Sequence, residues 1–216
     1  MSDVIKVDVW SDIACPWCYI GKRKFEAGAE GFDVEVEYHS FELAPDTPVD
    51  FAGSELDFLV AHKGMAAEQV KPMLEQVTTI AAEVGLDYDF GALQHTNTVK
   101  AHQLLHVAKA QGKQIEMKER LLRAYFVEGK HVGRAEDLAD LAAEIGLDRD
   151  AAVSALEADE YLAAVHDDQQ QAMRYGIRGV PFFVIDGKYG VSGAQAPETF
   201  AQALKQVQDE HAGVAS

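Results

Sequence analysis

Hydrophobic and polar positions alternate in two stretches near the start of the chain. Residues 4–10 alternate β-branched with charged side chains, and residues 32–38 repeat the pattern. A period of two is typical of a partly buried strand. Between these stretches, residues 19–30 carry apolar side chains at helical spacing and are followed by Gly31, a common residue after a helix C-terminus. The pattern predicts a strand, a helix and a second strand.

The hydrophobic period becomes helical near residue 54 and stays helical for more than a hundred residues. Ser54 and Asn97 are suitable N-caps for two of these helices. Gly85 and Gly146 follow apolar helical stretches and are suitable C-terminal stops. The middle of the chain is therefore predicted to be entirely helical.

Strand patterns return only near the C-terminus. Apolar residues 180–185 and residues 188–191 flank Asp186-Gly187, which is a strong signal for a two-residue hairpin turn. Pro197 then opens a last helix that carries apolar side chains on one face. The full order is strand, helix, strand, helical block, hairpin, helix.

This order predicts an α/β protein with an insertion. Removing the helical block leaves a small α/β sheet, so its two halves should fold together around the inserted helices. Residues 1–48 and 173–216 are predicted to form the two halves of the sheet domain, and residues 49–172 the inserted helical domain.

Composition and charge narrow the classes of partner. The chain has 216 residues, 48% of them hydrophobic, and a formal net charge of −17. So negative a surface argues against nucleic acid and anionic membranes as partners. No apolar stretch approaches the length of a transmembrane helix, and the first residues lack the basic and apolar regions of a signal peptide. We therefore expect a cytoplasmic protein, with its oligomeric state left open.

The only two cysteines of the chain form the motif Cys15-Pro16-Trp17-Cys18, between the first predicted strand and the helix that follows. Unpaired N–H groups and the positive end of the helix dipole favour a thiolate at a helix N-terminus. The pKa of the first cysteine of such a motif can lie well below that of a free thiol. Structural disulfides are rare in the cytoplasm, so a cysteine pair there indicates catalysis or metal binding.

Two histidines could complete a metal site with the cysteines. His102 and His106 are four residues apart on a predicted helix, and two such pairs are a zinc-like combination. Compact zinc modules keep the two pairs much closer in sequence, and both histidines fall to the side of the apolar stripe of their helix. We expect surface or pocket-edge histidines and no metal.

Six segments spread over nearly the whole chain form one recognisable set. They are Ser11–Gly21, Phe41–Leu43 with Pro45, Asn97-Thr98 with Ala101-His102, Ala124–Phe126 with Glu128-Gly129, Gly179–Phe183, and Ser192–Gln195. Together they resemble the DsbA-like branch of the thioredoxin fold, which carries a helical insertion, and more narrowly its FrnE-like cytoplasmic members.

The resemblance implies a thiol–disulfide oxidoreductase that acts as a disulfide reductase or isomerase. Cys15 would attack the substrate and form the mixed disulfide, and the more buried Cys18 would resolve it. Pro16 and Trp17 would set the redox poise. No cofactor is implied other than glutathione as a co-substrate, and the partners would be disulfide- or thiol-containing proteins or glutathione.

The resemblance also implies a cis Val180–Pro181 bond that faces the cysteines and presents the backbone of Val180 to an extended substrate. Asn97, Thr98 and His102 would line a substrate pocket on the side of the helical block.

Two carboxylates, Asp12 and Glu42, are candidates for modulating proton transfer at the buried Cys18. Most carboxylates in so acidic a chain are simply solvated, so both assignments rest on position alone.

Two other functions remain open from the sequence. Kappa-class glutathione transferases and 2-hydroxychromene-2-carboxylate isomerases resemble this chain in fold and length, but they carry serine where Cys15 stands. A glutathione-dependent transferase or isomerase acting on an aromatic or electrophilic molecule is therefore one alternative. A non-enzymatic redox sensor is the other.

Overall fold

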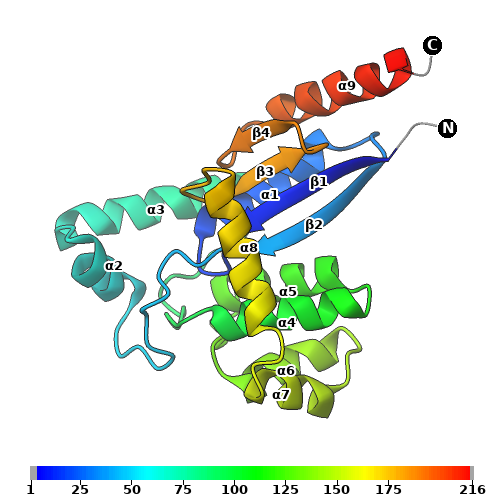
Figure 1. Cartoon of the computed structure of the whole chain (residues 1–216). Coiled ribbons are helices and arrows are strands. Elements are labelled where there is room, and N and C mark those ends of the chain that lie inside the picture. Colours follow the sequence, from blue (N-terminus) through cyan, green and yellow to red (C-terminus); the bar gives the residue numbers. More distant parts are fainter. Residues whose placement is uncertain (1–3, 215–216) are drawn as a thin grey trace.

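Four strands form one mixed sheet in the order β2-β1-β3-β4 (Figure 1). The computed structural model describes residues 4–214. Strand β1 (Ile5–Ser11) pairs in parallel with β2 (Val34–Ser40) and antiparallel with β3 (Phe182–Ile185), and β3 pairs antiparallel with β4 (Tyr189–Ser192). The predicted α/β architecture is confirmed, because strands from both ends of the chain meet in one sheet.

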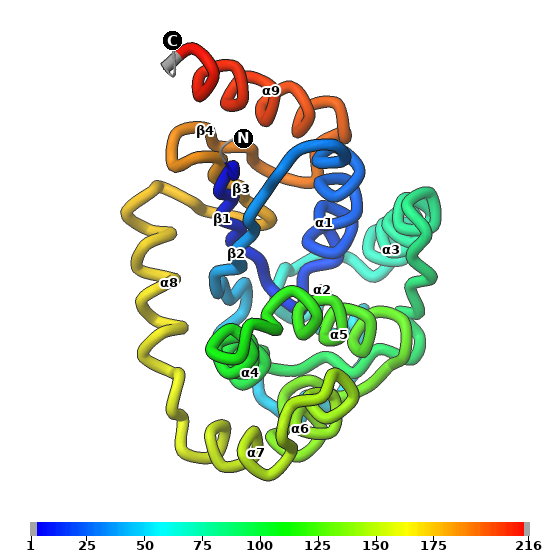
Figure 2. The backbone as a smooth tube through the Cα atoms, turned by 90° about the vertical axis from the view of Figure 1, so that its right-hand side faces the viewer, coloured from blue at the N-terminus to red at the C-terminus, as the bar shows by residue number. Residues whose placement is uncertain are grey.

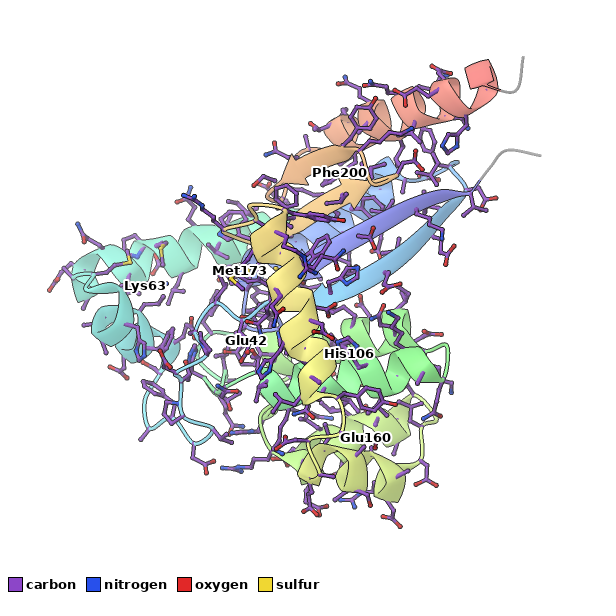
Figure 3. The ribbon with its side chains drawn as sticks, in the orientation of Figure 1. Glu42, Lys63, His106, Glu160, Met173 and Phe200 are labelled. Atoms are coloured by element: carbon purple, nitrogen blue, oxygen red, sulfur yellow. The ribbon has the colours of Figure 1, made fainter. Side chains whose placement is uncertain are left out.

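Helices α1 (Pro16–Gly28) and α9 (Pro197–Val214) pack together on one face of this sheet (Figure 2). The centroid of the Phe200 ring, labelled in Figure 3, lies 4.7 Å from the centroid of the Phe183 ring on β3. Gly28 allows the two helices to approach, since a Cβ atom at this position would lie 2.3 Å from the carbonyl oxygen of Pro197. This face therefore has a dense apolar core.

Helix α8 (Leu162–Arg174) covers the other side of the sheet, next to β2 (Figure 2). Trp10 of β1 is fully buried beneath it and donates its Nε1–H to the carbonyl of Asp168 at 3.0 Å. The same indole stacks on the ring of His39, with 4.5 Å between the centroids.

The rest of the predicted block is helical as expected. Its other helices are α2 (Glu55–Lys63), α3 (Ala67–Glu83), α4 (Val99–Ala110), α5 (Gln114–Phe126), α6 (Ala135–Glu144) and α7 (Arg149–Glu157). The N-cap position of α4, however, is occupied by Thr98 and not by the predicted Asn97. The apolar faces of α3 to α7 form one cluster that also contains Ile13, Tyr19 and Ile20 from the start of the chain. The helical block and the redox motif therefore share a core. How the chain divides into domains at residues 48 and 172 stays a prediction.

The sequence pattern misplaced several element boundaries; β3, for example, begins at Phe182 and not at residue 180. The first helix begins at Pro16 rather than at residue 19, because proline is suited to the first helical position. The second strand runs two residues later than predicted. Phe32 instead closes the turn after α1 by donating its N–H to the carbonyl of Ala29, and Gly31 supplies the positive φ of 86°.

The predicted hairpin turn has the expected backbone. Asp186 and Gly187 have φ values of 53° and 66°, as the favoured two-residue turn requires. Lys188 donates its N–H to the carbonyl of Ile185 at 3.0 Å. None of the helices within residues 4–214 has the length and apolar character that crossing a membrane would demand.

An ionic cluster ties β2 to α8. In His39, Nδ1 lies 2.9 Å from the carboxylate of Asp168, and Nε2 lies 2.9 Å from that of Asp8. Burial favours the neutral ring, but the two carboxylates outweigh it and raise the pKa of His39 to about 9 from its usual 6.5.

This cluster makes stability depend on pH in the alkaline range. The folded-state pKa of His39 lies above its unfolded value, so the contribution is complete below about pH 6.5 and is lost as the pH rises through 9. We expect the free energy of unfolding to fall by on the order of 3 kcal/mol over this range. Urea unfolding of His39→Gln should show a flatter profile. The exposed His166→Gln should keep the parental slope, and an equal slope in the two variants would contradict the assignment.

Candidate active site

The loop after β1 delivers the cysteine motif to the N-terminus of α1. Cys15 is the N-cap residue, with extended backbone angles, and Pro16 occupies the first helical turn. Cys18 donates its backbone N–H to the carbonyl of Cys15 at 3.0 Å. Both cysteines are free thiols, so the structure describes the reduced pair. Trp17 is 39% exposed, which agrees with the expectation that it lies near the surface.

Cys18 is not more buried than Cys15, contrary to the prediction. Each is 3% exposed. The segment around Val180 covers Cys15, and the Sγ atom of Cys15 lies 3.6 Å from the carbonyl oxygen of Val180. Residues far apart in the sequence therefore bury both sulfurs, which helical spacing alone does not reveal.

The Val180–Pro181 bond is cis and lies beside the motif, as predicted. Gly21 of α1 allows this approach, because a Cβ atom there would lie 2.8 Å from Cγ of Pro181. The carbonyl of Pro181 accepts the N–H of Gly193 at 2.8 Å, which fixes the loop to the end of the hairpin. That Val180 and Pro181 bind substrate stays a prediction.

The two thiols have opposite pKa shifts. The hydrogen bond between the sulfurs raises the pKa of Cys15 well above that of a free thiol, and burial and the charge of Asp12 add to the effect. Burial also raises the pKa of Cys18, but the hydrogen bond from Cys15, the charge of Lys118 and the hydroxyl of Ser11 outweigh it and lower that pKa. The expected lowering is therefore not found at Cys15 in the reduced pair, where Cys18 is the thiol whose pKa is lowered.

Sequence reasoning missed Lys118, the basic group that acts on this pair. Lys118 lies on α5 and is fully buried, and its Nζ has no hydrogen-bond partner among residues 4–214. A signal was available, because Lys118 falls one turn before Leu121 and Leu122 on the apolar face of a predicted helix. A lysine on such a face is rarely buried without an electrostatic partner.

Asp12 is the centre of a buried hydrogen-bond cluster next to the motif. Its carboxylate accepts the N–H of Leu43 at 2.9 Å and the hydroxyl of Thr98 at 2.9 Å, and it lies 3.2 Å from Nε2 of His102. Burial raises the pKa of Asp12, but His102 and the other donors outweigh it and lower that pKa. Asp12 is therefore an anion within the site.

The prediction that His102 and His106 lie at the surface or at a pocket edge is wrong. His102 is fully buried beside Asp12, and His106 is 9% exposed and pairs with Asp168 at 3.1 Å (Figure 3). Helices α5, α6, α7 and α8 all contact α4, so almost the whole circumference of α4 is covered. The narrow apolar stripe of the sequence could not indicate this.

The other two predicted polar residues, Asn97 and Glu42, make hydrogen bonds to neighbouring segments. Asn97 donates its side-chain N–H to the carbonyl of Pro45 at 2.8 Å and accepts the N–H of Val99 at 2.9 Å. Glu42 accepts the side-chain N–H of Gln169 at 2.8 Å. Neither set of contacts involves a cysteine, and a role in proton transfer for Glu42 remains only a prediction.

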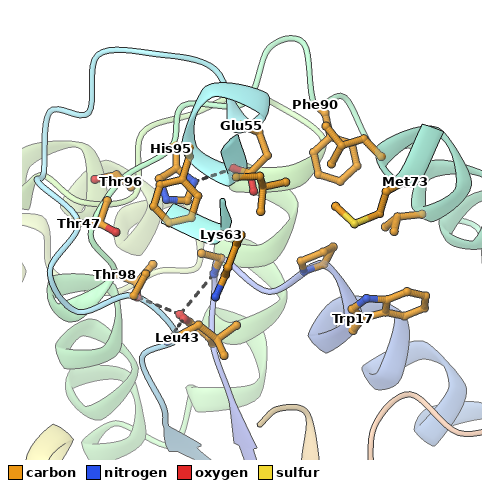
Figure 4. A pocket seen from close by; sticks show the side chains of 18 of the residues that line it. Trp17, Leu43, Thr47, Glu55, Lys63, Met73, Phe90, His95, Thr96 and Thr98 are labelled. Carbon is orange, nitrogen blue, oxygen red and sulfur yellow. Dashed lines mark hydrogen bonds and ion pairs between the residues drawn. The ribbon is translucent and has the colours of Figure 1, made fainter. Parts of the chain in front are cut away.

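A cavity of about 350 Å³ opens beside the motif (Figure 4). Thr98 lines it, whereas Asn97 and His102 do not, so the structure brings together only one of the three predicted pocket residues. The apolar wall of the cavity is formed by the cysteine motif, by helices α2 and α3, and by the loops next to these helices. Its apolar residues include Pro16, Trp17, Leu43, Phe58, Met73 and Phe90. The sequence pattern did not reveal the contribution of α2 and α3.

Comparisons with known proteins agree with this geometry. The family model described as the DSBA-like thioredoxin domain matches residues 6–205. YwbO of Bacillus subtilis, an uncharacterized protein, is 32% identical over 212 residues, covering 94% of this chain and 98% of YwbO. The crystal structure of a probable DsbA oxidoreductase from Streptomyces coelicolor superposes with a TM-score of 0.88 at 40% identity, covering 95% of this chain and 91% of that one.

More distant solved structures share the fold. The cytosolic disulfide reductase DsbM of Pseudomonas aeruginosa, solved with GSH, has a TM-score of 0.66 at 19% identity, covering 93% of this chain and 98% of DsbM. A 2-hydroxychromene-2-carboxylate isomerase has a TM-score of 0.75 at 16% identity, covering 98% of this chain and all of that one, 100%. The match of the family model over residues 6–205, with a cysteine pair at a helix N-terminus beside a cis proline, identifies the chain as a member of the DSBA-like thioredoxin domain family.

Proposed function

We propose that the protein is a thiol–disulfide oxidoreductase that works as a disulfide reductase or isomerase, with Cys15 as the attacking and Cys18 as the resolving thiol. The observation that carries the proposal is the position of the Cys15 sulfur, 3.6 Å from the carbonyl oxygen of Val180 at the cis proline. A substrate chain that runs along Val180 would bring its disulfide next to Cys15.

The hydrogen bond between the two sulfurs supports a two-step exchange. Moving the shared proton from Cys15 to Cys18 turns Cys15 into the thiolate, which attacks one sulfur of the substrate disulfide. The first substrate thiolate leaves, and a mixed disulfide remains on Cys15. Cys18 then passes its proton to the first substrate thiolate and attacks the Cys15 sulfur, which expels the second substrate thiolate and closes the Cys15–Cys18 disulfide.

The cavity beside Trp17 supports a preference for apolar substrates. It lies next to the attacking cysteine, and hydrophobic side chains form most of its wall. An apolar side chain of a disulfide-containing protein could enter it while the disulfide reaches Cys15. We propose such proteins, together with glutathione, as the partners, and the cytoplasm as the location. The likeness of the fold to that of cytosolic DsbM, solved with GSH, is consistent with both.

The same cavity favours one second candidate, a glutathione-dependent transferase or isomerase. An aromatic molecule could occupy the apolar space beside Trp17 while glutathione binds near Cys15. The fold shared with an isomerase of this kind is consistent with that possibility. The presence of Cys18 as a hydrogen-bonded second thiol favours disulfide exchange instead.

The reaction that the protein catalyses distinguishes the two candidate functions. The reduced protein should catalyse the reduction of insulin disulfides by glutathione, coupled to glutathione reductase. The second candidate would instead conjugate glutathione to 1-chloro-2,4-dinitrobenzene. A rate of insulin reduction no higher than that of the Cys15→Ser/Cys18→Ser double variant would remove the oxidoreductase proposal. A cysteine pair that oxidises and reduces without turnover would point to a redox sensor.

A further inference from the structure

We propose that Lys118 is the electrostatic partner of the Cys18 thiolate and holds the negative charge of the reduced pair on that sulfur. In this role Lys118 is a positioning residue that acts through Cys18. The inference rests on the dithiol chemistry proposed above and names a further residue for it.

Lys118 is buried in a way that its own contacts do not explain. The residue is 0% exposed, and its Nζ atom has no hydrogen-bond partner among the described residues. Its Nζ atom lies over the ring of Tyr38, 5.4 Å from the centroid. Burying an ammonium group without an anion is strongly unfavourable. A compensating negative charge must therefore lie nearby, or the lysine must give up its proton.

The neighbouring residue fixes Lys118 against the redox helix. Glu119 accepts the hydroxyl of Tyr19 and the ammonium of Lys22, each at 2.6 Å, and it also pairs with Arg23. All three partners belong to α1, the helix that carries Cys18. These bonds lock α5 onto α1, so Lys118 has a fixed position relative to the thiols.

The charged groups around Lys118 identify its partner. Cys18 exerts the largest attraction, followed by Asp12 and Cys15, while Lys22 repels it. Burial nevertheless lowers the pKa of Lys118 to about 8.

Asp12 cannot serve as the main partner. Its carboxylate is already committed to Leu43, Thr98 and His102. Tyr38 stays neutral, because burial raises its pKa. Cys18 is the remaining group with the largest attraction on Lys118, and Lys118 in turn is among the groups that lower the pKa of Cys18.

This pairing links the proton on Lys118 to the redox state. With Cys18 as the thiolate of the reduced pair, the pairing leaves one proton on Cys15 and one on Lys118. When a substrate disulfide oxidises the pair, two electrons leave and the Cys18 charge disappears. The attraction that held the Lys118 proton is then lost, so by linkage its pKa falls further. Two protons therefore leave with the two electrons and end on the two substrate thiols.

The pKa of Cys18 tests the pairing directly. In a Cys15→Ser background, the ultraviolet absorbance of the thiolate reports Cys18 alone. Adding Lys118→Met should raise the Cys18 pKa by about one unit or more. Lys109→Met is the matched control, since it removes the same charge from an exposed lysine of α4 that pairs with Glu37. A Cys18 pKa unchanged by Lys118→Met, or raised equally by the control, would overturn the inference.

Two further readouts separate this role from a structural one. The oxidised Lys118→Met protein should melt at a higher temperature than the oxidised parent, because methionine removes a buried amine that has lost its counter-charge. A lower melting temperature would assign Lys118 to packing and overturn the inference. NMR titration of the Lys118 side chain should give a lower pKa in the oxidised than in the reduced parent, and equal values would also overturn it.

These measurements do not depend on catalytic activity. Insulin reduction without the Cys18 pKa shift would remove only the role of Lys118. The pKa shift without insulin reduction would leave the pairing intact and remove the proposed activity.

Discussion

Cys15→Ser is expected to reduce disulfide turnover by several orders of magnitude, to the uncatalysed rate. The sulfur of Cys15 lies beside Val180, where the substrate chain is proposed to run, and a serine hydroxyl cannot replace a thiolate as nucleophile. The measurement is the initial rate of insulin reduction at fixed glutathione concentration, for variants whose far-UV circular dichroism matches that of the parent.

Cys18→Ser is the matched variant, because it removes the other thiol from the same helix turn. It should retain the first attack and accumulate a mixed disulfide on Cys15, which intact mass spectrometry detects as an added glutathione or peptide. The comparison tests the assignment of roles, because Cys18 rather than Cys15 is the thiol whose pKa is lowered in the reduced pair. If Cys18→Ser lost the first attack and Cys15→Ser kept it, the roles of the two cysteines would be reversed.

Asp12→Asn is expected to lower the free energy of unfolding by about 3 kcal/mol, because it disrupts a buried carboxylate with several donors. Its oxygens accept the N–H of Leu43 and the hydroxyl of Thr98, and they lie within hydrogen-bond distance of His102. An amide must turn an N–H group toward at least one of these partners. Urea unfolding at pH 7 measures the loss.

The same substitution should make the thiols more acidic. The hydrogen bond to Cys18 and burial raise the pKa of Cys15, and the charge of Asp12 adds to both. Neutralising Asp12 should therefore lower the pKa of Cys15, which the pH dependence of alkylation reports. Glu42→Gln is the control, because Glu42 binds Gln169. A Cys15 pKa that stays unchanged or rises in Asp12→Asn would show that its charge does not act on the pair.

Local patterns in the sequence predicted the elements that depend on neighbouring residues. Alternation in residues 4–10 predicted β1, because a strand buried on one face repeats every two residues. The hairpin followed from Asp186-Gly187, whose backbone preference is local. The position of the cysteine motif at a helix N-terminus was likewise readable from the strand before it and the helix after it.

Features that depend on tertiary packing were not predictable in this way. His102 looked peripheral because its own helix has a narrow apolar stripe, yet it is fully buried and four other helices contact α4. The raised pKa of Cys15 arises from a neighbouring thiol, from burial and from the Asp12 charge, all of which oppose the helix dipole. Lys118 is distant from the motif in sequence and close to it only after α5 has packed on α1.

The core that the redox motif shares with the helical block limits how the protein can be shortened or recombined. Ile13, Tyr19 and Ile20 flank the cysteines, and their apolar surface is covered by side chains of the inserted helices. Excising residues 49–172 would leave this surface bare to water, even though the strands on both sides could still pair. The insertion is therefore not a removable module, and grafting the motif onto a minimal scaffold would require a substitute for its covering helices.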